Sequence, residues 1–319
     1  MKKGIIIAAA VLTAVGLAIF IGVLCAVGFD ASKISSVRYE TNTYPVGEVF
    51  TDLEIRTTET DVVLKPSADG SCTVVCEERE KAKHTVCVEN GTLKVLLQDE
   101  RSFLDHIALF SKSMTLTVYL PLDRYQSLTV DSNTGDVTVP DSFAFETAVI
   151  TAKTSDIAFR ASASGLLKIE TTTGDIRTEG VRAGEILLSA TTGQIDVGSA
   201  VCEGEVSASV KTGKVNLSDV TCQSFRSKGS TGDLTMKNVI ASNSFTVERG
   251  TGDIRFDRCD AQEITVTAST GDVTGTLLSE KVFVAKTSTG RVVVPETTSG
   301  GTCRIQTSTG DIRITLAAE

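Results

Sequence analysis

Residues 231–254, TGDLTMKNVIASNSFTVERGTGDI, begin and end on the same motif, Thr-Gly-Asp followed by an aliphatic residue. Its full copies are Thr134, Gly135, Asp136; Thr173, Gly174, Asp175; Thr231, Gly232, Asp233; Thr251, Gly252, Asp253; Thr270, Gly271, Asp272; and Thr309, Gly310, Asp311. Degenerate copies stand at Thr154-Ser155-Asp156, Thr192-Gly193-Gln194, Thr212-Gly213-Lys214 and Thr289-Gly290-Arg291. The central residues are always 19 or 20 positions apart. Such a fixed period is typical of a solenoid, in which each repeat is one coil stacked on the last.

Apolar residues recur at fixed positions around this motif. The second position after the central residue is always aliphatic, from Val137 to Ile312, and apolar residues dominate four positions after it and five and seven before it. A spacing of two is the period of a half-buried strand, so each coil is expected to hold two short strands flanking the motif. A less regular third side is expected at Val181, Val220, Val239, Cys259 and Leu278. We therefore predict an all-β, single-stranded parallel β-solenoid (β-helix) with 19–20-residue coils.

The motif itself has a structural explanation. Glycine suits a corner that needs positive φ, and an aspartate next to it can accept hydrogen bonds from nearby backbone N–H groups. The shared aspartate column also raises the question of calcium, which needs several oxygen ligands per ion. Lys214 and Arg291 occupy the same column. We therefore expect turn residues here and neither a metal nor a cofactor.

The N-terminus predicts a membrane anchor. Residues 4–29 contain no charged residue and follow Lys2 and Lys3. This stretch exceeds the roughly 20 residues that span a bilayer, and the flanking lysines favour a cytoplasmic N-terminus. We expect one transmembrane helix over 1–29, with a cleaved signal peptide as the alternative, and a juxtamembrane linker over 30–50.

The remainder divides into a strand-rich lead-in over 51–123, which caps the solenoid, and regular coils over 124–319. Leu53–Leu64 resembles an imperfect first coil, and Asn90-Gly91 predicts a hairpin. The apolar cluster within 99–113 is expected to be a plug packed on the rod, or else a partner-binding patch. The chain ends shortly after the last motif, so we expect an exposed final coil that could support self-association through the C-terminal coil.

Charge and cysteine content limit the chemistry. The net charge is −9, which argues against nucleic acid as a partner. Two of the eight cysteines, Cys202 and Cys222, occupy the same place in consecutive coils, so a disulfide between them is one hypothesis and free core thiols are the other. One bridge among Cys72, Cys76 and Cys87 is left open. Two histidines and no CxxC pair make a structural zinc site unexpected.

The apolar anchor, the strand-rich lead-in, the Met114–Leu122 strand and the Thr-Gly-Asp coils together resemble the bacterial "putative adhesin" family, over about residues 50–316. The resemblance implies a β-solenoid with an envelope role, and it implies no catalytic residues. This chain departs from the motif at Ser155, Gln194, Lys214 and Arg291.

Three functions follow as hypotheses. The first is a non-enzymatic solenoid on the extracytoplasmic side of a bacterial cell membrane, held by a single-pass anchor, which binds a protein or a cell-wall glycan or senses envelope stress. The second is a cytoplasm-facing scaffold that assembles with itself. The third is a polysaccharide-active enzyme, with Lys153, Arg177, Asp196 and Asn216 lining a groove.

Overall fold

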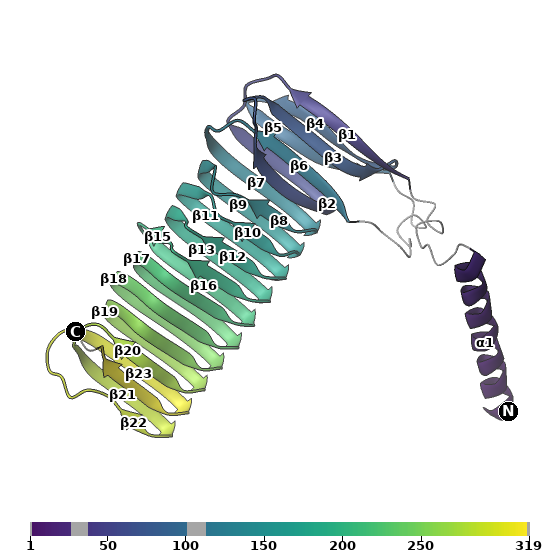
Figure 1. Cartoon of the computed structure of the whole chain (residues 1–319). Helices are drawn as coiled ribbons and strands as arrows, with labels where there is room; N and C mark the ends of the chain where they lie inside the picture. The colour runs from purple at the N-terminus through teal and green to yellow at the C-terminus, as the bar shows by residue number, and fades with distance from the viewer. Residues whose placement is uncertain (1, 27–37, 101–112, 318–319) are drawn as a thin grey trace.

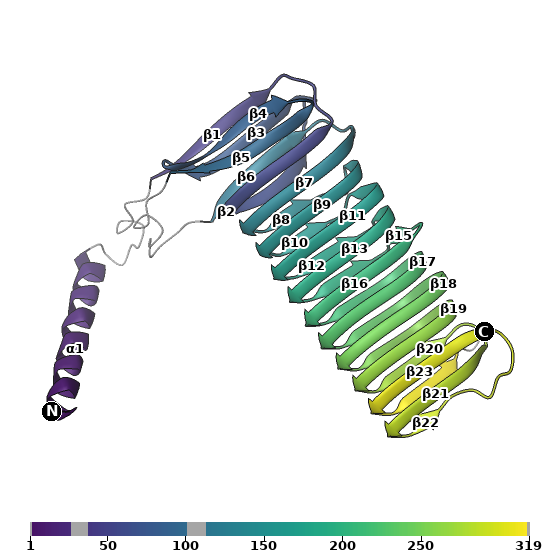
Figure 2. The ribbon, with the colours of Figure 1, turned by 180° about the vertical axis from the view of Figure 1, so that it is seen from behind.

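A computed structural model of the chain describes residues 2–26, 38–100 and 113–317. Its strands stack into one straight rod, seen from two sides in Figures 1 and 2. The prediction of a parallel β-solenoid is confirmed. The N-terminal part contains helix α1 (Lys2–Ala26) and strands β1 (Tyr39–Val46), β2 (Asp52–Pro66), β3 (Cys72–Arg79), β4 (Ala82–Glu89), β5 (Thr92–Asp99) and β6 (Met114–Leu120).

The strands of the regular coils follow in two groups. The first is β7 (Arg124–Thr134), β8 (Val137–Val139), β9 (Ala144–Thr154), β10 (Ile157–Phe159), β11 (Ser162–Thr173), β12 (Ile176–Glu179), β13 (Arg182–Thr192), β14 (Ile195–Gly198), β15 (Val201–Cys202) and β16 (Glu205–Thr212). The second is β17 (Val215–Thr231), β18 (Leu234–Thr251), β19 (Ile254–Thr270), β20 (Val273–Leu277), β21 (Lys281–Thr289), β22 (Val292–Val293), β23 (Gly301–Thr309) and β24 (Ile312–Leu316).

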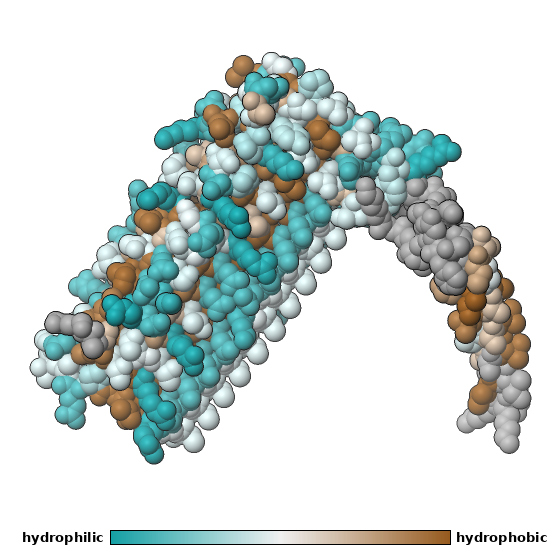
Figure 3. Space-filling model, in the orientation of Figure 1, coloured by the Kyte–Doolittle hydropathy of each residue, from teal (hydrophilic) through white to brown (hydrophobic). Residues whose placement is uncertain are grey.

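Neighbouring coils pair in parallel and in register, so each position of the repeat forms a column along the rod. Between β17 and β18, for example, Phe225 pairs with Phe245, Leu217 with Met236 and Thr231 with Thr251. Residues on the two sides of each corner alternate between the core and the solvent, which is the period of a pleated strand. The space-filling view shows the outward columns as hydrophilic rows running along the rod (Figure 3).

The predicted inward columns form the core, with two informative exceptions. Val137, Ile254 and Ile312 are all fully buried, but Val292 in the same column is 39% exposed because its coil ends the stack. Leu278 is 40% exposed because the register shifts by one residue after Gly275, so that Leu277 (1% exposed) pairs with Cys259 and fills the third side instead.

A second corner, which the repeat pattern did not reveal, lies six positions after the first. The residue there has a left-handed backbone in five consecutive coils, at Gly180, Ser199, Asp219, Asn238 and Arg258, with φ between 50° and 71°. Polar side chains tolerate this conformation better than β-branched ones do. The column is therefore varied in sequence but uniform in backbone geometry.

The N-terminal end of the rod is closed by antiparallel strands. β2 is the first coil, because it pairs in parallel with β7 and β8 on one side and with β5 and β6 on the other. β3 then pairs antiparallel with β6, and β1 with β3. β4 and β5 form the predicted hairpin, with positive φ at Asn90 and Gly91. The lead-in thus continues the sheet and changes its strand direction.

The C-terminal end differs from the prediction of sequential coils. β23 pairs with β19 on one side and with β21 on the other, and β24 likewise lies between β20 and β22. The last coil of the chain, β23–β24, therefore lies between the coil of β19 and β20 and the coil of β21 and β22. The expectation that the C-terminal coil is the exposed one was wrong: the terminal rung of the rod is β21–β22.

Two expected segments remain to be accounted for, the membrane anchor and the apolar cluster. The residues expected to anchor the chain include α1, a helix of 25 residues. Across the residues that are described, no helix is both long and apolar enough to cross a membrane. Most of the apolar cluster expected over 99–113 falls within 101–112, outside the described residues.

Candidate functional site

The aspartates of the corners form a hydrogen-bonded ladder along the rod. Oδ1 of each aspartate accepts a hydrogen bond from the backbone N–H of the equivalent residue in the next coil. Asp136 accepts from the N–H of Asp156 at 2.9 Å, and Asp253 from that of Asp272 at 3.0 Å. The ladder begins at Asp61 of β2, which accepts the N–H of Asp136 at 2.9 Å. Each carboxylate thus binds a backbone group that the corner would otherwise leave unpaired. This gives the column a structural role.

The same corners require glycine for close packing. Gly213 and Gly252 have φ of 142° and 140°. A Cβ at Gly213 would lie 1.7 Å from the carbonyl oxygen of Gly193. Any side chain would therefore both strain the backbone and collide with the coil above.

Three of the four departures from the motif fall at breaks or at the end of this ladder, whereas the corner of Ser155 lies within it through Asp156. The side chain of Gln194 accepts no described hydrogen bond from the next corner, whereas its backbone N–H donates to Asp175. Lys214 lies 3.7 Å from Asp233, which offsets the negative charge of the column. Arg291 donates its backbone N–H to Asp311 at 2.8 Å. No described coil lies beyond Arg291, so no further backbone N–H is there for a side chain at this position to accept. A carboxylate would have no backbone partner there.

The outward charged residues considered for catalysis satisfy one another. Arg177 lies 2.6 Å from Asp175 and 3.8 Å from Asp196, which also accepts the side-chain amide of Asn216 at 2.8 Å. These groups form a polar row on an open face, and neither of the two hollows described below includes them. Lys153 is exposed on the strand before its corner.

One face of the rod carries a shallow hollow of about 690 Å³. It extends over β13, β16, β17, β18 and β19 and is floored by the outward columns two and four positions before the corner. The outward lining is dominated by small hydroxyl side chains, with two lysines and one glutamate: Ser189, Thr191, Ser209, Lys211, Lys228, Ser230, Glu248, Thr267 and Ser269. Lys228 lies 3.0 Å from Glu248. We call this the hydroxyl face. Its small residues expose hydrogen-bonding groups and backbone to an approaching ligand.

A second hollow, of about 730 Å³, lies where consecutive coils carry glycine at one position. Gly165 and Gly184 stack so closely that a Cβ at Gly184 would lie 2.5 Å from the carbonyl oxygen of Gly165. Arg124, Arg182 and Glu203 also line the hollow. The mixed charges do not select one class of ligand.

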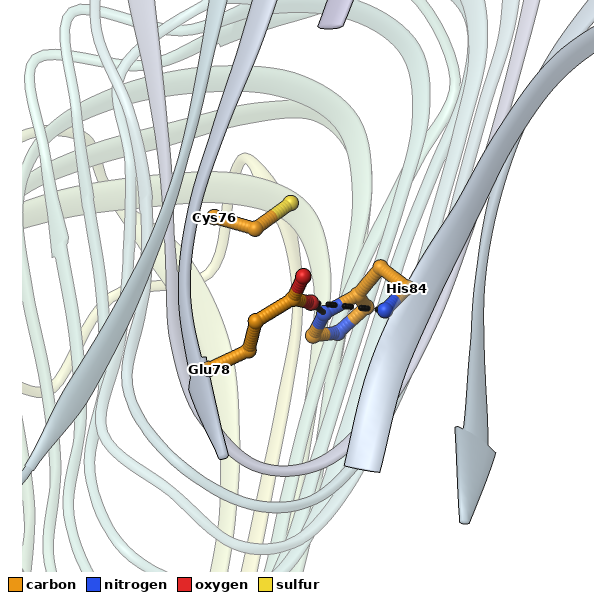
Figure 4. Close-up of side chains that lie close together, drawn as sticks. All are labelled: Cys76, Glu78 and His84. Carbon is orange, nitrogen blue, oxygen red and sulfur yellow. Dashed lines mark hydrogen bonds and ion pairs between the residues drawn. The ribbon is translucent and has the colours of Figure 1, made fainter. Parts of the chain in front are cut away.

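The most chemically distinctive cluster lies in the closed end of the rod. Cys76 and Glu78 of β3 and His84 of β4 are buried there, with ligand-type atoms within 4.8 Å of one another. Figure 4 shows the carboxylate of Glu78 facing the imidazole of His84, with the coils of the rod behind them. Nδ1 of His84 is 2.9 Å from Glu78 Oε2.

Glu78 is surrounded by hydrogen-bond donors. The backbone N–H of His84 donates to Oε2 at 2.6 Å, and the side chains of Asn42 and Tyr44 donate to Oε1 at 2.6 and 3.2 Å. Thr57 Oγ1 lies 3.3 Å from Nε2 of His84. A neutral imidazole that donates from Nδ1 to Glu78 and accepts at Nε2 from Thr57 satisfies every one of these contacts. The cluster thereby ties together β1, β2, β3 and β4.

Burial governs the protonation of this cluster. Desolvation lowers the pKa of His84, against the opposing effect of the hydrogen bond and charge of Glu78. Burial also raises the pKa of Cys76 to about 12 and that of Tyr44 to about 12. The thiol and the phenol are therefore protonated at neutral pH, and Glu78 is the acceptor at the centre.

The cluster fits a metal ion poorly. A bound zinc would need the thiolate of Cys76 and a free imidazole nitrogen. The thiol holds its proton, Nδ1 and Nε2 of His84 already have partners, and both oxygens of Glu78 accept hydrogen bonds. Metal binding would break several buried hydrogen bonds at once. The residues are better matched to a polar plug that ends the apolar core; we call Asn42, Tyr44, Thr57, Glu78 and His84 the polar plug.

Cys202 and Cys222 occupy corresponding places in adjacent coils, since their neighbours Val201 and Thr221 are paired. Both are buried, free thiols. Burial raises the pKa of Cys222 to about 12. Cys76 pairs in register with Asn42 and Leu116, and Cys87 with Lys94, so these two cysteines do not face each other. The disulfide between Cys202 and Cys222 stays a hypothesis.

Comparison with known families assigns the repeats. The family model described as Toastrack DUF4097 matches residues 50–209 and again 201–319. The chain belongs to the Toastrack DUF4097 family. The two matches together cover the lead-in and all the coils, so this Toastrack chain has its first coil, β2, inside the family's domain. A comparison with curated proteins gives no match.

Solved structures similar to this Toastrack protein include three putative adhesins. That from Parabacteroides distasonis ATCC 8503 is 11% identical, covers 86% of this chain and 98% of its own, and has a TM-score of 0.40. That from Parabacteroides merdae ATCC 43184 is 8% identical, covers 87% of this chain and 96% of its own, and has a TM-score of 0.43. That from Bacteroides fragilis NCTC 9343 is 15% identical, covers 88% of this chain and 98% of its own, and has a TM-score of 0.42.

The repeat pattern did not identify the polar plug, although one signal for it exists. Cys72, Val74, Cys76 and Glu78 share the inward side of β3. A glutamate in an inward position of an otherwise apolar alternation indicates a buried partner, and the nearby His84 is one of only two histidines in the chain.

Proposed function

We propose that this Toastrack protein is a non-enzymatic binding module that recognises an extended polar polymer, of the cell-wall glycan class, with its hydroxyl face. The observation that carries the proposal is the hydroxyl face itself. It joins five neighbouring coils into one surface of small hydroxyl side chains, with Lys211 and an ion pair between Lys228 and Glu248 among them. A polymer lying along the rod would meet the same groups at each coil, so weak contacts would add through repetition.

The regular coils support a binding role over catalysis. Catalysis needs a site that excludes water and holds reacting groups in fixed positions. Here the corner aspartates are engaged with backbone N–H groups, and the charged groups near them pair with one another on an open face. Release of reducing or unsaturated sugars from wall polysaccharide by the purified protein would contradict this part of the proposal.

The location is proposed from the sequence. Residues 4–29 are uncharged and follow two lysines, which favours an anchor with the rod on the extracytoplasmic side of a bacterial membrane. A cytoplasm-facing scaffold is the second candidate. Cys259 and Cys303 favour it, because their paired neighbours are not cysteines and unbridged thiols persist in reducing compartments. Protease treatment of intact cells separates the two. Digestion of the rod before lysis supports external display, and protection until lysis contradicts it.

Binding is tested with the detergent-solubilised full chain and purified cell-wall glycan in a co-sedimentation assay. Ser230→Tyr fills the hydroxyl face with a bulky side chain and is expected to weaken binding at least tenfold. Thr235→Tyr is the matched control, because Thr235 follows the corner and lies outside the lining of the hollow. Equal binding by both variants would refute the assignment of the hydroxyl face.

A further inference from the structure

The two ends of the rod are finished differently. At the N-terminal end, the polar plug and the antiparallel strands cover the core, and Leu53, Ile55 and Leu93 are each 1% exposed. At the other end, the described pairing of β21 is with β23 alone, and that of β22 is with β24 alone. One flank of the terminal rung therefore presents unpaired backbone groups.

The apolar core is open at this terminal rung. Phe283 and Ala285 continue the inward columns of Ile264 and Val266, but they are only half-buried, whereas Ile264 and Val266 are 1% exposed. Val292 is 39% exposed in a column that is otherwise buried. Removing such side chains from water is worth roughly 25 cal/mol per Å² of apolar surface.

The outward side of the same rung is apolar too. Val284 is 57% exposed, Val293 48% and Val282 39%. With Val292, these make four of the eight large hydrophobic residues that are exposed outside α1 among the described residues. Scattered exposed valines are ordinary, but a group of this kind on one terminal rung, shared between β21 and β22, marks an interaction surface.

We propose that the terminal rung pairs with the terminal rung of a second copy of this chain. An edge strand is satisfied by another strand, and two-fold symmetry places the two copies of β21 antiparallel. Because this two-fold pairing uses the same edge of both copies, it stops at two copies and does not propagate into a fibre. The exposed charges around the rung are balanced, with Lys286 and Arg291 against Glu280 and Glu296, so two copies can face each other without net repulsion.

The pairing is independent of the hydroxyl face. β1 begins at Tyr39 in the closed end, so the chain enters the rod at the end opposite the terminal rung (Figure 1). If the proposed anchor holds that closed end, the paired rungs lie away from the membrane. The hydroxyl face, on the side of the rod, stays accessible in the dimer.

The test is sedimentation velocity of the detergent-solubilised full chain over a range of concentrations. Val282→Lys with Val284→Lys places like charges opposite each other across the proposed interface and is expected to weaken association at least tenfold. The matched control is Val201→Lys with Thr221→Lys, an adjacent outward pair on β15 and β17. Since α1 is present in every variant, a difference between them reports on the rung alone. Circular dichroism establishes that each variant is folded.

The proposal requires two chains per particle in the wild type and in the control, and one in the double β21 variant. Hydrogen exchange at β21 should rise in that variant and not in the control. A wild type that stays monomeric, a β21 variant that stays dimeric, or particles that keep growing with concentration would each overturn it. Ser230→Tyr should remain dimeric, so a failure of glycan binding and a failure of pairing give different results.

Discussion

Asp311 donates its backbone N–H to Oδ1 of Asp272, 39 residues earlier in the chain, at 2.8 Å. The corner between them in sequence, that of Gly290 and Arg291, lies beyond Asp311 in space. The coil order at the C-terminal end is therefore not the order of the chain, and the aspartate ladder runs through the inserted coil without a break. Five predictions test this and the other structural conclusions.

The inserted coil predicts which pairs of residues can be cross-linked. Thr265 of β19 pairs with Arg304 of β23, and Arg304 pairs with Val284 of β21. Thr265→Cys with Arg304→Cys should react with a short bifunctional thiol reagent. Thr265→Cys with Val284→Cys should not, because a coil separates them. Mass spectrometry of the digested product identifies the linkage, and efficient cross-linking of Thr265→Cys to Val284→Cys would mean that the coils follow chain order.

Loss of a ladder aspartate should destabilise its two coils. Asp272→Ala removes the acceptor of the Asp311 N–H and should cost about 1–2 kcal/mol of unfolding free energy. Lys214→Ala, in the same column but outside the ladder, should change stability by no more than about 0.5 kcal/mol. Denaturant unfolding compares the two. Similar losses for both would show that the ladder contributes little.

Removal of the carboxylate in the polar plug should be severe. Glu78→Ala leaves the buried His84 N–H and the half-buried side chains of Asn42 and Tyr44 without this acceptor. Each such group costs roughly 1–3 kcal/mol, so a total loss on the order of 3–5 kcal/mol is expected. Glu80→Ala, on an exposed residue of the adjacent turn, is the control. The melting temperature gives the comparison, and a mild effect of Glu78→Ala would argue that the plug is loosely packed.

His84 should make stability depend on pH. Burial lowers its pKa in the folded state below the ordinary value of 6.5, so the unfolded chain binds a proton more readily. The contribution of His84 is therefore complete above about pH 6.5 and is lost as the pH falls from there towards the lowered pKa, by at most about 1.4 kcal/mol per pH unit.

Replacing the histidine by His84→Gln should flatten this segment of the stability profile. Denaturant unfolding at a series of pH values measures it. Carboxylates that titrate at lower pH remain in both proteins, so the comparison is restricted to the window just below pH 6.5. An unchanged slope in the variant would show that another group is responsible.

Arg249 is a buried charge within the solenoid, and the charge of Asp233 offsets its desolvation only in part. It is 3% exposed, and its described hydrogen bond is from Nη2 to the hydroxyl of Ser227 at 2.8 Å, while Nε and Nη1 have no partner. Burial lowers the pKa of its guanidinium to about 10. A Cβ on Gly229 would lie 1.7 Å from Nη1, so the glycine makes room for the arginine.

Arg249→Met should therefore stabilise the protein by about 1–4 kcal/mol, because an apolar chain of similar length removes the desolvation cost. Arg255→Met, on an exposed arginine three positions past the next corner, should be nearly neutral. Thermal unfolding distinguishes them. A fall in melting temperature for Arg249→Met would indicate that the guanidinium has a partner in solution.

The sequence predicted the coils because the constraint on them is local and repeated. Gly252 and the eight other corner glycines have positive φ, and Ile254 and its equivalents alternate with polar residues, so many copies of one pattern reinforce each other. The hairpin at Asn90-Gly91 follows from turn chemistry in the same way. The polar plug was missed because Asn42, Thr57, Glu78 and His84 come from four strands, and their proximity is set by antiparallel pairings that no repeat encodes.

By itself, then, the sequence determined that the chain winds into equal coils with aliphatic columns inside, since period and side-chain alternation are properties of neighbouring residues. Only the tertiary structure decided the order in which the last coils stack. Coils that share one corner motif offer nearly equivalent edges, so either Thr309 or Thr289 could pair with Thr270. Local pattern cannot choose between them, because the choice is made by contacts between whole coils. In the structure Cys303, Ile305 and Ile312 are buried in the inner position, and the valine-rich coil lies at the end.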